Sequence, residues 1–163
     1  MINKANIPYH PTTAAPIDID YTSNDDIQDR ISDYRAQITT ARMISGLSFP
    51  AACKLLFGGS NLTQSQLAER ADVNISTVQS YLIDSCQKRP TLNTAIAICI
   101  GMQLPPIIST QLIACAGYIL GASEVDILYQ IILSEYYDHK ICYANQLLIE
   151  KGHPPLTREI SKK

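Results

Sequence analysis

Apolar residues recur along most of this chain at spacings of three and four, which is the period of an amphipathic α-helix. No stretch shows the strict apolar and polar alternation that indicates a half-buried strand. The pattern therefore predicts an all-α fold. Helices are expected at residues 25–46, 49–57, 64–71, 75–83, 92–101, 106–116, 124–137 and 139–150.

These helices suggest four parts in the chain. Residues 1–24 carry three prolines among polar and small residues and read as a flexible acidic tail. Residues 25–46 form an amphipathic helix that serves either as a strut on the body or as a dimerisation helix. Residues 47–101 form a small helical domain, and residues 102–163 form a C-terminal helical extension.

Residues 62–81 have the capping and turn residues of two helices joined by a tight turn. Thr63 is a favourable N-cap and Gln66 follows three residues later, which completes a capping box. Asp72 and Val73 are expected to make the turn, and Asn74 is expected to cap the second helix. The segment thus predicts a helix-turn-helix.

The second of these helices, over residues 75–83, is predicted to be two-sided. Val78 and Tyr81 fall on its inner face, whereas Ser76, Gln79 and Ser80 share the opposite side. The polar side is the candidate reading surface.

Within and just after this segment stand Gln64, Leu67, Ala68, Ala71, Val73, Ser76, Thr77, Val78, Tyr81 and the run Lys88, Arg89, Pro90 and Thr91. On these residues the segment resembles the lambda-repressor-like, or XRE-type, helix-turn-helix family of bacterial and phage transcriptional regulators. The resemblance covers roughly residues 50–101, and it implies a sequence-specific regulator that binds double-stranded DNA. The segment departs from the family pattern in two ways. Asp72 stands where glycine is usual, and the second helix, over residues 75–83, contains no positive charge.

The residue types on the second helix suit base recognition in the major groove. A glutamine amide offers adenine a donor and an acceptor together, so Gln79 is the best single candidate for base readout. Ser76, Thr77 and Ser80 flank it, and their hydroxyls adapt to either partner.

Phosphate contacts are expected around this surface. Gln64 matches the family position that holds the DNA backbone, at a helix start where N–H groups also point at an anion. Asn74, at the start of the second helix, is expected to contact phosphate in a similar way. Lys88 and Arg89 are the expected charged phosphate contacts.

Charge and composition refine this hypothesis. The net charge is −2 and the pI is about 5.9, which argues against a protein that holds nucleic acid by bulk electrostatics. Few basic residues imply weak binding by one copy, so we expect a homodimer that reads two half-sites. The apolar surplus of residues 107–148 would either form that dimer or complete the core of one chain.

Other classes of function have little support. No phosphate-binding loop, HExxH or GxSxG motif is present, so no enzyme activity and no cofactor are expected. The five cysteines are widely spaced and the three histidines lack ligand spacing, which argues against a metal site and fits a reducing cytoplasm. Prolines 105 and 106 interrupt the uncharged stretch 90–123, so no membrane helix is expected there.

A second hypothesis stays open. The acidic pI and the uncharged second helix also suit a protein-interaction adaptor, or the antitoxin half of a toxin pair, whose helix-turn-helix is degenerate for DNA. In that case the C-terminal helices would bind a protein partner.

Overall fold

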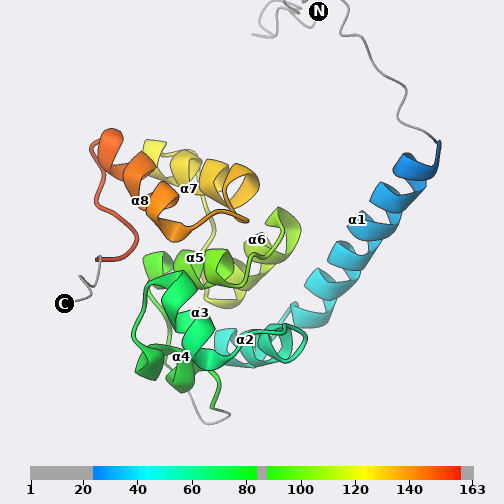
Figure 1. The fold of residues 1–163 in the computed structure, drawn as a ribbon, viewed down its shortest axis with the longest axis horizontal. Helices are drawn as coiled ribbons and strands as arrows, with labels where there is room; N and C mark the ends of the chain where they lie inside the picture. The colour runs from blue at the N-terminus through cyan, green and yellow to red at the C-terminus, as the bar shows by residue number, and fades with distance from the viewer. Residues whose placement is uncertain (1–23, 84–87, 159–163) are drawn as a thin grey trace, which may run out of the picture. The chain divides into compact units, whose positions relative to one another are not determined.

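A computed structural model of the chain describes residues 24–83 and 88–158, and within these ranges it is entirely helical (Figure 1). This confirms the predicted all-α class for the described residues. The predicted tail of residues 1–24 lies almost wholly outside them. The helices are α1 (Asn24–Ile44), α2 (Phe49–Gly58), α3 (Gln64–Ala71), α4 (Ile75–Tyr81), α5 (Leu92–Gly101), α6 (Pro106–Cys115), α7 (Glu124–Glu135) and α8 (Ile141–Glu150).

The chain divides into two compact units, Met1–Tyr34 and Arg35–Lys163, and the division falls inside α1. The described part of the first unit is the start of α1, from Asn24. All other helices belong to the second unit.

The starts of α2, α3, α5 and α7 were predictable from their capping residues. Thr63 Oγ1 accepts from the Gln66 N–H at 3.2 Å and Gln66 Oε1 accepts from the Thr63 N–H at 2.9 Å, which confirms the capping box of α3. Ser48, Thr91 and Ser123 likewise accept a backbone N–H at the starts of α2, α5 and α7.

Several predicted helix limits were wrong by two residues. The helices expected over 25–46 and 75–83 end at Ile44 and Tyr81, and two limits around residue 138 also differ. The helix expected over 124–137 ends at Glu135, and the one expected from residue 139 begins at Ile141. Between them the His139 N–H donates to the Tyr136 carbonyl at 3.0 Å, and Lys140 adopts an extended backbone at the N-cap of α8. This turn replaces the last helical turn that the apolar period predicted.

Helix α5 lies in the middle of the second unit and contacts α3, α6, α7 and α8 (Figure 1). Every residue from Ala95 to Gly101 is buried. At its end the approach to α3 is so close that a Cβ on Gly101 would lie 2.8 Å from the Cβ of Ala71. Glycine is therefore required at residue 101 by packing rather than only as a helix stop.

One hydrophobic core runs through the second unit, from Ile44 at the end of α1 to Leu156 after α8. Much of the apolar surplus of residues 107–148 is inside it, including Leu112, Ile132 and Leu148. Of the two roles considered for that surplus, these residues fill the core of one chain. None of the described helices combines the length and the apolar character needed to cross a bilayer.

Candidate nucleic-acid interface

Helices α3 and α4 are joined by a turn whose backbone follows the left-handed conformation at Asp72, with φ 50° and ψ 47°. The Val73 N–H then donates to the Ala68 carbonyl at 3.0 Å, which ends α3. Asp72 thus takes the conformation that glycine adopts most easily, and aspartate tolerates it better than most side chains. The two helices contact each other directly.

One side of α4 is anchored in the core. Val78 and Tyr81 are buried, and the Tyr81 ring packs edge-on against Phe49 at a centroid distance of 5.3 Å. This T-shaped pair is a favourable aromatic geometry. The anchoring fixes which side of α4 faces outward.

The outward side carries the predicted base-reading residues unequally. Ser76 and Gln79 are exposed, whereas Thr77 and Ser80 are half-buried. The Ser80 hydroxyl donates to the Thr77 carbonyl at 2.7 Å, within the helix. Of the four predicted readers, Ser76 and Gln79 are therefore the two most accessible to a ligand.

Gln64 and Asn74 lie at the starts of the two helices. Gln64 is the first residue of α3 and is exposed. Asn74 occupies the N-cap position of α4, but its side chain makes no capping hydrogen bond, contrary to the predicted cap. A backbone φ of −64° and ψ of 141° nevertheless places it at the boundary that a cap would occupy.

Lys88 and Arg89 follow the segment 84–87, which lies outside the described residues, and they differ in their surroundings. Lys88 is exposed. The Arg89 guanidinium donates from Nε to the Ala116 carbonyl at 2.7 Å and from Nη2 to the Gly117 carbonyl at 2.8 Å. It also lies 4.2 Å above the centroid of the Tyr118 ring.

Arg89 therefore caps the carboxyl end of α6, where the helix dipole favours a cation. The Tyr118 hydroxyl adds a hydrogen bond of 3.0 Å to the carbonyl of Pro90, the next residue along the chain. Nothing in the sequence around Arg89 indicated these partners, because they lie 27 and 28 residues further on. Its predicted phosphate contact stays a prediction.

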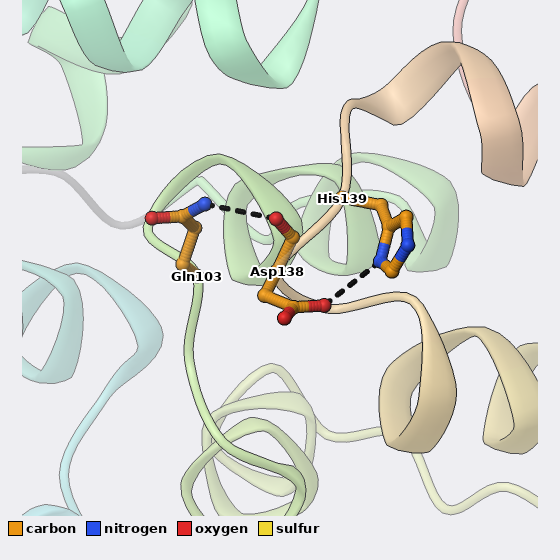
Figure 2. Close-up of polar contacts among 3 residues, drawn as sticks. All are labelled: Gln103, Asp138 and His139. Carbon is orange, nitrogen blue, oxygen red and sulfur yellow. Dashed lines mark hydrogen bonds and ion pairs between the residues drawn. The ribbon is translucent and has the colours of Figure 1, made fainter.

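A second polar cluster was missed by the sequence analysis. Gln103 has a positive φ of 53°, and its Nε2 donates to the Asp138 carbonyl at 3.1 Å (Figure 2). Its Oε1 accepts from Arg70 at 3.5 Å. Figure 2 also shows the contact of 2.8 Å between Asp138 Oδ1 and His139 Nδ1. Gln103 therefore connects α3 with the turn between α7 and α8.

Burial disfavours the thiolate form of three of the cysteines. Burial raises the pKa of Cys99 to about 12, and it raises the pKa of Cys53 and of Cys115 above the ordinary value of 9.0. Cys142 is exposed, and Cys86 lies outside the described residues. Within residues 24–83 and 88–158, no group of three or more His, Cys, Asp or Glu side chains is arranged to hold a metal ion.

Comparisons of this chain with protein-family models, with curated proteins and with solved structures found no match in any of the three.

Proposed function

We propose that the protein is a sequence-specific DNA-binding regulator that inserts α4 into the major groove and acts as a homodimer. The observation that carries the proposal is the division of α4 into a buried side with Val78 and Tyr81 and an exposed side with Ser76 and Gln79. A short helix anchored on one side presents a rigid row of hydrogen-bonding groups on the other, as base readout requires.

The surroundings of α4 add support. The turn at Asp72 joins α3 directly to α4, so the exposed Gln64 at the start of α3 belongs to the same helix pair as Gln79. Side chains at helix starts commonly hold the DNA backbone and fix the register of the reading helix. Lys88 is exposed and supplies a positive charge beyond α4.

The test is fluorescence anisotropy of the purified protein on DNA from upstream of its own gene, across a salt series. Gln79→Ala should lower the affinity for the preferred fragment by about 5- to 150-fold, the equivalent of about 1–3 kcal/mol for one bidentate base contact. Binding to random DNA should change little. Gln146→Ala, on the exposed side of α8, is the matched control and should bind as the unmodified protein does.

A second candidate function is a protein-interaction adaptor or antitoxin. It is favoured by the absence of positive charge on α4 and by the engagement of Arg89 with the end of α6. Both leave few free cations for phosphate contacts. If no fragment binds better than random DNA even at low salt, the regulator proposal falls and the adaptor becomes the leading function.

A further inference from the structure

Helix α1 carries an exposed row of large apolar side chains. Ile27, Ile31, Tyr34 and Ile38 are 45%, 43%, 55% and 41% exposed, respectively. All four belong to one uninterrupted helix, from Asn24 to Ile44. Such a row on one helix is more than the scattered apolar exposure of an ordinary surface.

The spacing of this row is that of a coiled-coil seam. The steps between successive members are four, three and four residues, which alternate as a and d positions of a heptad do. Ile31 and Ile38 fall at position a, whereas Ile27 and Tyr34 fall at position d. Three aspartates of this helix lie away from the seam: Asp26 and Asp33 fall at outer position c, and Asp29 falls at outer position f.

The residues beside the seam decide what can cover it. Position g holds Arg30 and Gln37, and position e holds Gln28 and Arg35. In a parallel pair of α1 helices, g of one copy meets the following e of the other, so Arg30 would face Arg35 twice. Like charges at both flanks disfavour that arrangement.

An antiparallel pair removes the conflict. In this arrangement e faces e and g faces g, so Gln28 meets Arg35 of the second copy, and Arg30 meets Gln37 of the second copy. One register pairs all four apolar residues with one another: Ile27 with Ile38, and Ile31 with Tyr34. A twofold axis between residues 32 and 33 then repeats each contact, as an isologous dimer requires.

We propose that α1 pairs antiparallel with α1 of a second copy of this chain in that register. The proposal deepens the homodimer of the proposed function by naming its interface, and it rests on the seam and its flanking charges without reference to DNA. The alternative surface at residues 107–148 is largely used, because Leu112, Ile132 and Leu148 are already buried within one chain.

The first test measures the oligomeric state of the full chain by light scattering and sedimentation over micromolar concentrations. The unmodified protein should be dimeric, and Ile31→Asp should shift it to the monomer. Ala36→Asp adds the same charge at outer position f, so it is the matched control and should stay dimeric. Circular dichroism of all three proteins checks that the helices remain.

A second variant guards against local unfolding of α1. Arg30→Glu keeps the apolar seam and should weaken the dimer much less than Ile31→Asp does. A monomeric unmodified protein, or a dimer that Ile31→Asp leaves intact, would overturn the proposal.

The orientation is tested by disulfide trapping in a Cys86→Ser, Cys142→Ser background. Ile31→Cys and Tyr34→Cys proteins, one of them carrying a size tag, should cross-link to each other when mixed and oxidised. Each alone should cross-link poorly, because in the proposed register neither residue meets its own copy. Efficient self-linkage of each single variant, without the mixed product, would show a parallel pair and overturn the register.

DNA binding measured on the same proteins separates this proposal from the function. An α1 dimer that binds no DNA would reject the regulator and leave the interface standing. A monomer that binds DNA specifically would reject the α1 interface and leave sequence-specific DNA binding standing.

Discussion

Arg89 provides the sharpest prediction about the stability of the body, because two hydrogen bonds from its guanidinium join the entry to α5 with the end of α6. Replacing it by glutamine removes the charge, both fixed donors and the contact with the Tyr118 ring. A hydrogen bond that involves a charged group contributes about 1.5–3 kcal/mol, and an exposed cation–π contact about 0.5–1 kcal/mol.

These contributions do not add in full at Arg89. Nη2 lies in exposed surroundings, so water replaces part of its bond to the Gly117 carbonyl. We therefore expect Arg89→Gln to lower the free energy of unfolding by about 2 kcal/mol. At an m-value of about 2 kcal/mol/M, this moves the urea midpoint down by about 1 M.

The neighbouring residue supplies the control. Lys88→Gln removes the same charge from an exposed side chain and should change stability by less than about 0.5 kcal/mol. Arg89→Lys should recover little, because an ammonium cannot reproduce the planar fork that reaches both carbonyls. Equal urea midpoints for Arg89→Gln and Lys88→Gln would refute the bracing role.

The same pair of variants separates bracing from phosphate binding. Loss of a phosphate contact reduces the slope of log affinity against log salt concentration by about one. Loss of the contacts between Arg89 and the end of α6 lowers the affinity without changing that slope. We expect the slope to fall for Lys88→Gln and to stay unchanged for Arg89→Gln. The reverse result would make Arg89 a phosphate ligand in spite of its contacts with α6.

Two further predictions concern the core. Gly101→Ala should destabilise the protein by about 1–3 kcal/mol in urea unfolding, because the added Cβ would overlap Ala71. Gly58→Ala meets no atom within 4 Å and should be neutral or slightly stabilising; equal losses for both would contradict the close approach of α3 and α5. The raised pKa of Cys99 keeps the folded state protonated between pH 9 and about 12, where the unfolded thiol ionises, so stability should fall as pH rises through that window. The upper limit of this loss in the free energy of unfolding is about 4 kcal/mol. Cys99→Ala should flatten the decline of stability with pH in unfolding measurements, and a variant with the same decline as the unmodified protein would contradict the prediction.

Local sequence signals predicted the helices well. The caps at Ser48, Thr63, Thr91 and Ser123 act over three residues, and the apolar period acts over one or two turns, so both can be read without knowledge of the fold. The predicted limits failed near residue 138. There a turn closed by the His139 N–H competes with a helical pattern that is equally compatible with the sequence.

Contacts between residues far apart in the sequence could not be predicted from these local signals. Arg89 was predicted to contact phosphate because it is a cation after a helix-turn-helix, and no local signal indicated its hydrogen-bond partners near residue 117. Gln103 connects residues 70 and 138, and no short motif indicates its left-handed backbone. The helical spacing of the apolar residues on α1 was predictable from the sequence, whereas their exposure depends on which surfaces the rest of the chain covers.

The burial of α5 bears on how the two candidate functions relate to the fold. A helix whose residues from Ala95 to Gly101 are all buried needs neighbours on every side, and α3 supplies only one of them. The others are α6, α7 and α8, which belong to the predicted C-terminal extension. These helices therefore stabilise the platform on which α4 is held, whether or not they also bind a partner. A protein that bound α7 and α8 would act on the same compact unit that presents Gln79, so an adaptor and a regulator need not use separate parts of this chain.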